Sequence, residues 1–322
     1  MEAPVGDEAR LLSAIREASD YLQKEIGWFI PVSSTWTLRG SGETYQRTSP
    51  FLALVGDITN GDETLTSADV MLQPPGRYWA GGPYVGIDIL DDAEQEWDDT
   101  DVDSVQLSVR EGLYEELRAT GATLTSTQSA GAETLVVSDG SKVSPGMVLS
   151  IGSEQELVTG TGAATDAVTT LSAAAALGDE YLSLTSATSV KVGEIIRVDF
   201  EQMRVKDIRS GKASVARGWN GTTKTSHLIN AEVDVYRTFR VERAVNGTSA
   251  AEHLSSVTIS RYVAPDDIVF LARQIATLML NKSKGGYAGK TGNMDTGQVF
   301  YNDAFPKYDI ERVKRVYFIP SV

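Results

Sequence analysis

Gly131-Ala-Glu-Thr-Leu135 and Gly178-Asp-Glu-Tyr-Leu182 are two copies of one pattern, and they decide how the middle of the chain is organised. An internal repeat outweighs any local pattern, because overlooking one leads to the wrong fold. The copies stay aligned without a gap through further matching residues, which are Val143 with Val190, Gly146 with Gly193, Glu154-Gln155 with Glu201-Gln202, and Val158 with Val205. The chain therefore contains the front half of a module twice.

A second pattern is also present twice, with a different spacing. Val215-Ala-Arg-Gly-Trp-Asn-Gly-Thr222 matches Val241-Glu-Arg-Ala-Val-Asn-Gly-Thr248. The match continues through His227-Leu228 with His253-Leu254, Val233 with Ile259, and Tyr236 with Tyr262. Tandem copies would run front, back, front, back, whereas this chain runs front, front, back, back.

This order predicts a nested insertion. An outer module of residues 131–160 plus 238–262 would carry an inner module, residues 178–237, in one of its loops. The hypothesis requires the strand near Glu156–Val158 to lie beside the strand near Arg240–Arg243.

The repeated segments have the composition of β-strands. Ile195–Val198 and Met203–Val205 are short, rich in β-branched residues and bounded by turn residues. Asn220-Gly221 and Asn246-Gly247 supply the positive φ angles of a tight turn, and each is predicted to close a hairpin or a related turn. The repeat therefore predicts a duplicated all-β barrel or sandwich.

Composition limits the class of protein. The chain has 322 residues, of which 41% are hydrophobic and 23% charged, enough for two domains with proper cores. No stretch approaches the apolar run of about 18 residues that a membrane span needs. The first residues lack the pattern of a signal peptide, so the Asn-Gly-Thr sequons are interpreted as turns rather than glycosylation sites.

The chain has no cysteine and a net charge of −15, from 29 basic and 44 acidic residues. Disulfides, thiol catalysis and zinc sites built on thiolates are therefore excluded. A strongly acidic surface repels the phosphate backbone, which argues against a reader of nucleic-acid sequence. The same charge suits a channel wall past which DNA slides without sticking.

Amphipathic helices are predicted near both ends. Apolar residues at helical spacing predict a helix over residues 7–26, with Asp7 as its N-cap and Gly27 just beyond its end. A second helix is predicted from Asp266 or Asp267 to about Lys282, and a last one from Asp309 to Phe318. Because each helix must bury its apolar face, we expect the two ends of the chain to pack together.

The predicted fold class is α+β: a helical base formed by the N- and C-terminal helices with a small β-region, plus the inserted duplicated β-module. The domain prediction assigns residues 1–124 to the N-terminal part of the base, 125–262 to the insert and 263–322 to its C-terminal part. Strands are expected between residues 35 and 109, a short helical turn over 112–119 and a linker over 123–130.

A catalytic interpretation finds little support. The only two histidines, His227 and His253, occupy equivalent positions seven residues after each turn Asn, which favours a structural role over a general base. The predicted structural-turn residues are Asn220, Gly221, His227, Asn246, Gly247 and His253. No catalytic motif is present, so no catalytic residue, cofactor or metal site is predicted. A carboxylate pair for glycoside hydrolysis stays open, because sequence spacing does not fix the separation of the carboxyl groups.

Two further motifs are weak. The acidic segment Asp91–Asp101 leads into a partial calcium-loop pattern, but Ser104 stands where the turn glycine belongs and Arg110 where the bidentate Glu belongs. A solvated acidic loop is the better interpretation. Gly289-Lys-Thr291 suggests a phosphate loop, but Lys284 replaces the first glycine, so a mobile loop is expected instead.

Two runs at opposite ends carry a resemblance to a known family. Leu11-Leu-Ser-Ala-Ile-Arg-Glu-Ala-Ser-Asp-Tyr-Leu22 is followed by Gly27-Trp-Phe29, and Ala264-Pro-Asp-Asp-Ile-Val-Phe-Leu-Ala-Arg273 by a Gly-rich loop and a short terminal helix. In these runs the chain resembles the head–tail connector (adaptor) family of tailed bacterial and archaeal viruses. The Glu201-Gln-Met203 motif, with Ala216–Thr222 and His227, is also similar to β-domains common in virion proteins.

The resemblance implies a non-enzymatic structural protein of the virion neck, assembled in the host cytoplasm. It implies a homo-oligomeric ring, usually a dodecamer, between the portal protein and the next neck or tail-completion protein. DNA would pass through without sequence-specific binding, and no membrane would be involved. The residues that the resemblance places against the portal are Arg312, Lys314, Arg315, Tyr317, Phe318 and Ile319. The large insert departs from the compact family pattern, so its role stays open.

The alternative function is a carbohydrate- or receptor-binding virion module. It is motivated by the Asn-Gly turns of the β-repeat and by Trp79, Tyr84 and Trp219, since aromatic rings are common in binding surfaces. The loop Pro74–Tyr84, rich in aromatic residues, Pro and Gly, is either a contact surface for a partner or a loop packed on its own sheet.

Overall fold

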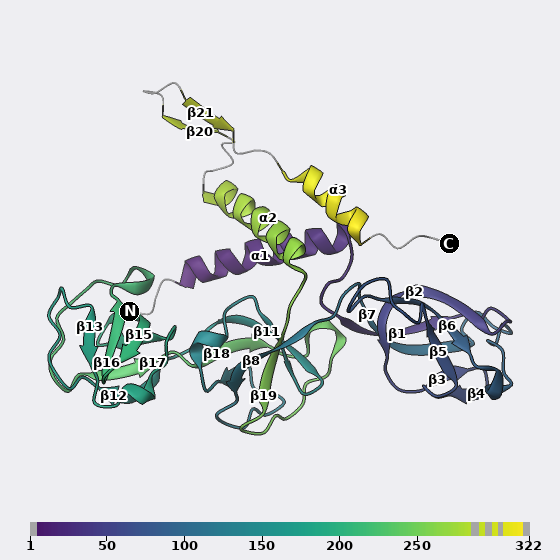
Figure 1. The fold of residues 1–322 in the computed structure, drawn as a ribbon, viewed down its shortest axis with the longest axis horizontal. Helices are drawn as coiled ribbons and strands as arrows, with labels where there is room; N and C mark the ends of the chain where they lie inside the picture. Colours follow the sequence, from purple (N-terminus) through teal and green to yellow (C-terminus); the bar gives the residue numbers. More distant parts are fainter. Residues whose placement is uncertain (1–4, 285–289, 294–297, 302–304, 318–322) are drawn as a thin grey trace. The chain divides into compact units, whose positions relative to one another are not determined.

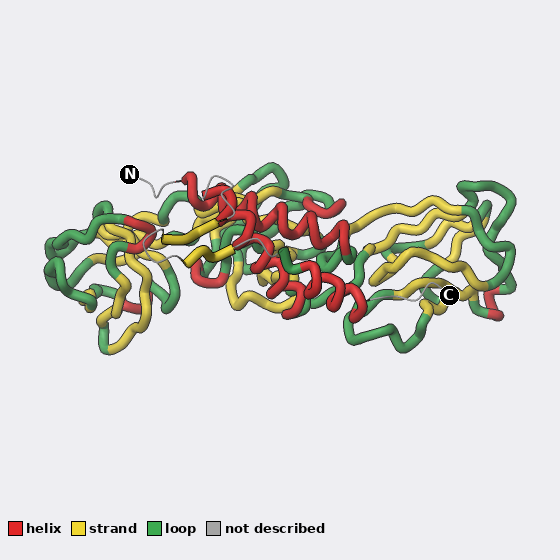
Figure 2. The backbone as a smooth tube through the Cα atoms, turned by 90° about the horizontal axis from the view of Figure 1, so that it is seen from above, coloured by secondary structure: helices red, strands yellow, loops and turns green. Residues whose placement is uncertain are grey.

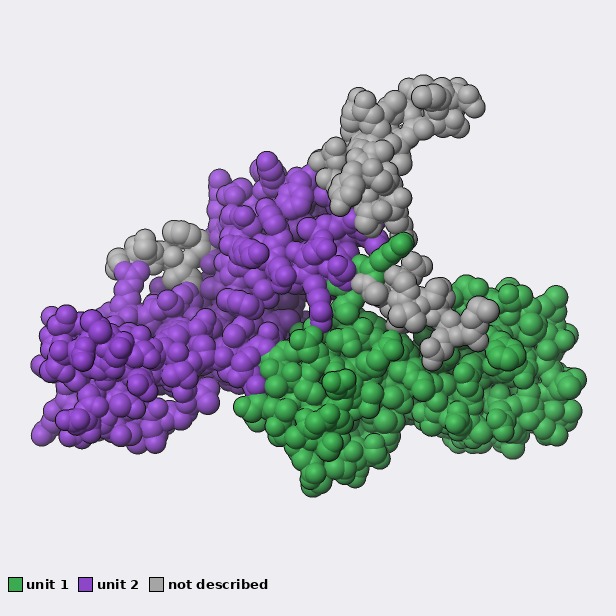
Figure 3. Space-filling model, turned by 180° about the vertical axis from the view of Figure 1, so that it is seen from behind, with its two compact units in different colours: residues 1–12, 118–245, 249–261 green, residues 13–117, 246–248, 262–322 purple. Residues whose placement is uncertain are grey.

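The computed structural model describes residues 5–284, 290–293, 298–301 and 305–317 (Figure 1). The chain divides into two compact units, coloured separately in Figure 3. Unit 1 comprises residues 1–12, 118–245 and 249–261, and unit 2 comprises residues 13–117, 246–248 and 262–322. Within the described residues, no helix is both long enough and apolar enough to cross a membrane.

Unit 2 contains a seven-stranded antiparallel sheet with the order β4-β3-β7-β2-β6-β5, in which β1 also pairs with β7. Its strands are β1 (Val32–Leu38), β2 (Tyr45–Leu54), β3 (Ile58–Asn60), β4 (Glu63–Leu65), β5 (Val70–Gln73), β6 (Tyr84–Ile89) and β7 (Val105–Glu111). The sheet buries its own core around Phe51, Trp97 and Leu107. The short strands β3 and β4 were not predicted.

The three helices of the described chain are α1 (Val5–Glu25), α2 (Asp266–Lys284) and α3 (Lys307–Val316). Figures 1 and 2 show them lying against one another. Their common core includes Ala18 and Leu22 of α1, Ile275 of α2 and Ile310 of α3. Gly27, just past α1, has a φ of +131°, which a residue with a side chain rarely adopts. The hairpin of β20 (Lys290–Asn293) and β21 (Gln298–Tyr301) lies between α2 and α3 in the chain.

The predicted fold class was wrong. The structure is mostly β, with 39% of the residues in strands and only three helices in the described part of the chain, and it is not an α+β protein built on a helical base. Three of its four hydrophobic clusters belong to β-sheets, and the helices form the fourth. The reason is that the region before the insert, expected to be a small β-region, forms a complete seven-stranded sheet with a core of its own.

Unit 1 consists of two six-stranded antiparallel sheets. The outer module contains β8 (Leu117–Thr123), β9 (Thr134–Val136), β10 (Val148–Ile151), β11 (Glu154–Thr161), β18 (Thr238–Glu242) and β19 (Thr258–Tyr262). The inner module contains β12 (Thr165–Thr170), β13 (Tyr181–Ser183), β14 (Ile195–Val198), β15 (Glu201–Arg209), β16 (Lys212–Ala216) and β17 (Glu232–Val235).

The two modules have the same topology. The strand order is β8-β19-β10-β11-β18-β9 in the outer module and β12-β17-β14-β15-β16-β13 in the inner one. The whole inner module lies between β11 and β18 of the outer module in sequence, and these two strands pair, with Val158 opposite Val241. This is the pairing that a nested insertion requires. Both modules begin earlier than the repeat suggested, because β8 and β12 are their first strands.

Each module is closed by an equivalent bridge between its two edges. Leu124 bridges Val137 in the outer module, and Leu171 bridges Leu184 in the inner one. All four side chains are buried, and each belongs to the core of its own module. The helical turn expected over residues 112–119 and the linker expected over 123–130 were therefore wrong, because this stretch supplies the first outer strand and the closing bridge.

The Asn-Gly turns do not close hairpins. Asn220 and Asn246 do adopt the left-handed conformation, with φ angles of 52° and 55°. However, β16 and β17 are not neighbours, nor are β18 and β19. Each turn instead begins a longer crossing that brings a histidine back to the sheet. The prediction of a positive φ at these positions is thus confirmed, and that of a hairpin is wrong.

The helical core gives a direct test of packing in unit 2. Ile275→Ala removes a fully buried side chain of α2 and should lower the free energy of unfolding by about 2–5 kcal/mol. Tryptophan fluorescence during urea denaturation measures it, because four of the five tryptophans lie in residues 13–117. Phe270→Ala, on the exposed face of the same helix, is the control and should change stability by less than about 0.5 kcal/mol. Equal losses would contradict this packing.

Candidate functional site

Each module of unit 1 contains a buried ion pair between a glutamate and an arginine, and a histidine contacts the same glutamate. In the inner module, the guanidinium of Arg217 binds both carboxylate oxygens of Glu201, with Nε at 2.8 Å from Oε1 and Nη2 at 2.7 Å from Oε2. His227 Nε2 lies 3.0 Å from the same Oε2. The side chains of Glu201 and His227 have no exposed surface, and that of Arg217 is 1% exposed. We call this group the inner cage.

Glu201 is held by the backbone as well as by side chains. The amide of Gly218 donates to Oε1 at 2.9 Å and that of Thr225 to Oε2 at 3.0 Å. Burial alone would raise the pKa of Glu201, but the hydrogen bonds from Arg217, Thr225, Gly218 and His227 outweigh it and lower the pKa to about 2. The carboxylate is therefore ionised at every ordinary pH.

The outer module has an equivalent cage formed by Glu154, Arg243 and His253. Arg243 Nε lies 2.7 Å from Glu154 Oε1, and its Nη2 lies 2.6 Å from Oε2. His253 Nε2 is 2.8 Å from Glu154 Oε2, and the amides of Ala244 and Ala251 donate to the two oxygens at 3.0 Å. Against the cost of burial, these bonds lower the pKa of Glu154 to about 2.

The arginine of each cage also ties distant loops together. Arg217 Nη1 donates to the carbonyl oxygens of Ala176 and Asp179, at 3.1 and 2.9 Å. Arg243 Nη1 donates in the same way to those of Ser129 and Ala132, at 2.8 and 3.1 Å. Because the same bonds recur in both copies, each cage fixes the loops that close one end of its module.

The two cages differ at three equivalent positions. Glu156 of the outer module corresponds to Met203, and Gln128 corresponds to Ala175. The outer module thus has a hydrogen-bonded Gln-Glu pair where the inner one has two apolar side chains. The third difference is Gly152, which corresponds to Asp199; the Asp199 carboxylate lies 2.7 Å from His227 Nδ1.

The geometry of both cages indicates a structural role. A carboxylate has about four lone-pair sites, and each cage glutamate already accepts five hydrogen bonds from its arginine, its histidine and two amides. No lone pair is left for a metal, and no exposed oxygen is left for a substrate. The histidines therefore hold a buried carboxylate in place rather than acting as general bases.

The two modules of unit 1 are joined by a third buried ion pair. Arg237, in the segment between β17 and β18, binds Glu194 through two bonds of 2.7 and 2.9 Å. The amide of Gly140, in the outer module, donates to Glu194 at 3.0 Å, and Lys191 Nζ donates to the carbonyl oxygen of Ser138 at 2.7 Å. Glu194 is fully buried. This junction links the modules into one body.

A cavity of about 420 Å³, with both polar and apolar surface, lies beside this junction. Its wall includes a chain of hydrogen bonds in which Asn220 Nδ2 donates to Gln202 Oε1 at 2.8 Å and Gln202 Nε2 donates to the Tyr236 hydroxyl at 2.9 Å. Arg197 also lines it, but is paired with Asp234 at 2.6 Å. The lining groups thus largely satisfy one another.

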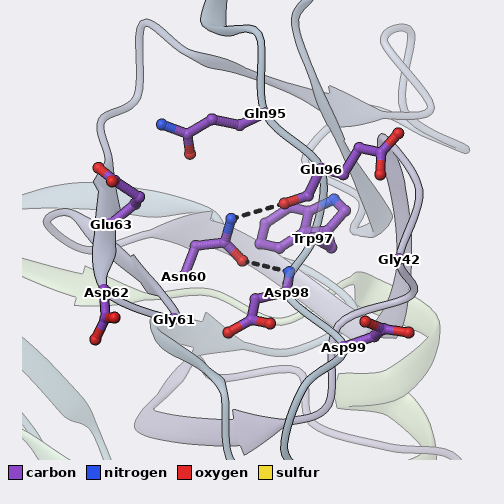
Figure 4. Close-up of a pocket in the computed structure, with 10 residues that line it drawn as sticks. All are labelled: Gly42, Asn60, Gly61, Asp62, Glu63, Gln95, Glu96, Trp97, Asp98 and Asp99. Carbon is purple, nitrogen blue, oxygen red and sulfur yellow. Dashed lines mark hydrogen bonds between the residues drawn. The ribbon is translucent and has the colours of Figure 1, made fainter.

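A second, open pocket lies in unit 2 beside the acidic segment (Figure 4). Asn60 holds its floor, since its side chain donates to the carbonyl oxygen of Glu96 at 2.9 Å and accepts from the amide of Asp98 at 2.8 Å. In Figure 4 the carboxylates of Glu63, Glu96 and Asp99 point in different directions. This does not form a cation site, and the interpretation as a solvated acidic loop is retained.

The residues predicted to face a portal lie in α3 and just after it, and they differ in how exposed they are. Arg312 and Arg315 are exposed. Lys314 forms an ion pair with Glu25 of α1, which raises the pKa of Lys314. Tyr317 packs inside unit 2, with its ring 5.0 Å from that of Phe29 and its hydroxyl donating to Asp267. Phe318 and Ile319 lie outside the described residues, as does Gly289 of the predicted mobile loop.

The aromatic residues of the carbohydrate-binding alternative are mostly used in packing. Trp79 donates to the carbonyl oxygen of Leu113 at 3.1 Å and packs edge-on against Tyr317. Tyr84 packs against Phe51. Trp219 is half-buried, and the guanidinium of Arg204 lies over its ring. The rings of Trp79 and Tyr84 therefore anchor the Pro74–Tyr84 loop to the rest of unit 2.

Comparisons with protein-family models, curated proteins and solved structures found no match to this chain.

The two histidines of the cages were predicted from the sequence as structural residues, but the ion pairs were not predicted. Glu154, Glu201, Arg217 and Arg243 were all visible as repeated residues, and a charged residue that recurs in both copies of a β-module is the signal that could have identified them. What the repeat alone does not show is that the arginine, the glutamate and the histidine meet inside the sheet.

The low pKa of the cage glutamates predicts a loss of stability in acid. A group whose pKa is lowered in the folded state stabilises the fold above its unfolded pKa, and this contribution is lost as the pH falls from about 4.5 toward 2. Glu201→Gln should remove the acid dependence of the inner module and lower its stability by roughly 3–5 kcal/mol at neutral pH. Circular dichroism during acid and thermal unfolding measures both effects.

Glu180→Gln is the matched control, because Glu180 belongs to the same module but its side chain is 67% exposed. It should leave both the stability and its acid dependence almost unchanged. If Glu201→Gln kept the acid dependence of the native protein, the assignment of that dependence to the cages would fail.

Proposed function

We propose that this chain is a structural virion protein of the head–tail connector type, which forms a ring between the portal and the neck or tail. The observation that carries the proposal is a difference between the two modules. The inner module exposes large apolar side chains where the outer one has mostly small or polar residues; the pairs are Leu177 with Ala130, Tyr181 with Thr134, Phe200 with Ser153, Leu228 with Leu254, and Ile229 with Ser255.

The exposed residues are not needed for the fold, because the outer module has the same topology without them. Phe200 is 80% and Leu228 79% exposed. Large exposed apolar groups that gather in one region are a usual mark of a protein–protein contact. Asp199 binds His227. Phe200 follows Asp199 in the sequence and Leu228 follows His227, so Phe200 and Leu228 belong to adjoining loops at one end of the inner module. We call the region of Phe200, Leu228 and Ile229 the inner tip.

The cages support an assembly role in a second way. Each module buries its most reactive groups in a satisfied ion pair, and the junction pair holds the two modules together. A rigid pair of modules with an apolar end is suited to bracing a neighbouring subunit. Within the proposal, the inner tip contacts the next copy in the ring.

The portal contact is assigned to α3. Its Arg312, which forms an ion pair with Asp309 of the same helix, and its Arg315 are exposed basic side chains on a chain with a net charge of −15. Such a contrast favours a specific acidic partner surface and speeds encounter. The acidic balance elsewhere is compatible with a passage that DNA crosses without binding. The carbohydrate-binding alternative is less well supported, because two of its three aromatic rings are used in intramolecular packing.

Electron microscopy of the chain mixed with the portal protein of the same virus tests the portal contact. The native chain should add a ring to the portal, and Arg312→Glu with Arg315→Glu should abolish this at moderate salt, because it reverses the charge of the exposed α3 surface. Arg209→Glu, a charge reversal at an 85% exposed side chain of the inner module, should have no effect. A chain that never associates with the portal would contradict the proposal. Glycan-array binding that is lost in Trp219→Ala would favour the alternative.

The role of the inner tip is tested by giving it the residues of the outer module. Phe200→Ser with Ile229→Ser should weaken ring formation at least tenfold in sedimentation velocity, since it removes apolar contact area. Thermal stability should not fall, because both side chains are exposed in the single chain. Leu254→Ser, at an exposed leucine of the outer module, is the control. Unchanged assembly in the double variant would exclude this surface from the ring contact.

A further inference from the structure

The outer cage contains one more buried carboxylate than the inner cage. Glu156 has no exposed surface, and the equivalent inner residue is the apolar Met203. A buried carboxylate without a compensating charge is strongly unfavourable, so its surroundings must supply one. The outer cage therefore needs one more compensating positive charge than the inner cage.

Every group that faces Glu156 within the described residues comes from four elements. Arg243, just after β18, places Nε 3.1 Å from Glu156 Oε1, and His253, before β19, places Nε2 3.8 Å from the same oxygen. Glu154 lies on the same strand. The neutral Gln128, before β9, donates from Nε2 to Glu156 Oε2 at 3.1 Å.

The charges of this group do not balance without a proton. Glu154 and Glu156 contribute two negative charges and Arg243 one positive charge, so a neutral His253 leaves one negative charge inside the module. Arg243 already spends its two strongest contacts on Glu154, at 2.6 and 2.7 Å. In the inner cage the second carboxylate, Asp199, is 54% exposed, and water screens its charge.

A metal ion is a poor candidate for the missing charge. Glu154 has no lone pair left, because its oxygens accept from Arg243, His253 and two backbone amides. The guanidinium itself also occupies the space between the two carboxylates. A proton needs neither free lone pairs on Glu154 nor additional volume.

We propose that the outer cage is a proton-binding site, in which one proton on the buried Glu156 carboxyl group completes the charge balance. With Glu156 protonated, the remaining charges of Glu154 and Arg243 cancel and the cage is neutral. The inner module, with Met203 and Ala175 at the corresponding positions, has no such site. This inference concerns one module and does not depend on the proposed virion role.

The environment of Glu156 supports the direction of the effect. Burial is the largest influence and raises the pKa of Glu156, more than Gln128 and Arg243 lower it. A carboxyl group whose pKa is raised on folding binds its proton more tightly in the folded state. Its contribution to stability is therefore complete below its unfolded pKa and is lost as the pH rises through the folded pKa. This is opposite in sign to the effect of Glu154.

Hydrogen exchange of the full chain, measured by mass spectrometry between pH 5 and 8 and corrected for intrinsic rates, tests the proposal. In the native protein, protection of peptides from β10 and β11 should fall with rising pH by up to about tenfold per pH unit, the slope for one proton. Glu156→Met, which installs the residue of the inner module, should remove most of this slope. It should also raise protection at pH 8. Peptides from β14 and β15 serve as the internal control and should be the same in both proteins.

Glu156→Gln is the second variant, because it keeps the shape of the side chain and the contact with Gln128 but does not titrate. It should lose the slope as Glu156→Met does, which covers the case in which Met does not pack. A native protein without a slope in β10 and β11, or a slope unchanged in both variants, would overturn the proposal. A loss of slope in the two variants with an unchanged inner module would establish it.

Discussion

The structure of unit 1 depends on a glutamate carboxylate buried at the centre of each β-module. A buried charge is tolerated only when it is paired and fully hydrogen-bonded, and this requirement accounts for the features around it. An arginine must reach Glu201 or Glu154 from another strand, a histidine must return to it, and backbone amides must point at it. The crossing that begins at each Asn-Gly turn brings these groups together, which is why the turn, the arginine and the histidine recur as one motif.

The nested arrangement follows from the same requirement. The glutamate of the outer cage lies on β11 and its arginine follows β18, and the whole inner module separates these strands in sequence. The insertion is compatible with the outer cage because its two ends leave from paired strands, so β11 and β18 stay neighbours. The junction pair of Glu194 and Arg237 then fixes the insert to its host. The two copies differ in two ways: the outer one has the buried carboxylate of Glu156, and the inner one has the exposed apolar tip.

In unit 2, local sequence patterns predict the helices but not all of the strands. The long helices were predicted almost to the residue, because amphipathic periodicity over five turns is a strong signal. The short strands β3 and β4 have three residues each, and their formation depends on the pairing of β4 with β3 and of β3 with β7 rather than on their own composition. The sheet before the insert was thus underestimated, and with it the β content of the chain. Leu117–Thr123 was missed for a similar reason, since a polar segment becomes a strand only when a neighbour accepts it.

What the sequence determined by itself is the set of features that arise from nearest neighbours or from repetition. These are the terminal helices, the left-handed conformation of Asn220 and Asn246, the duplication, and the order of its halves. Only the tertiary structure decided which charges meet, because Glu154 and Arg243 are 89 residues apart and a salt bridge between them needs the sheet to be formed. The same holds for Glu156: its place in the sequence looks like any strand position, and its unbalanced charge appears only when the strands around it exclude water.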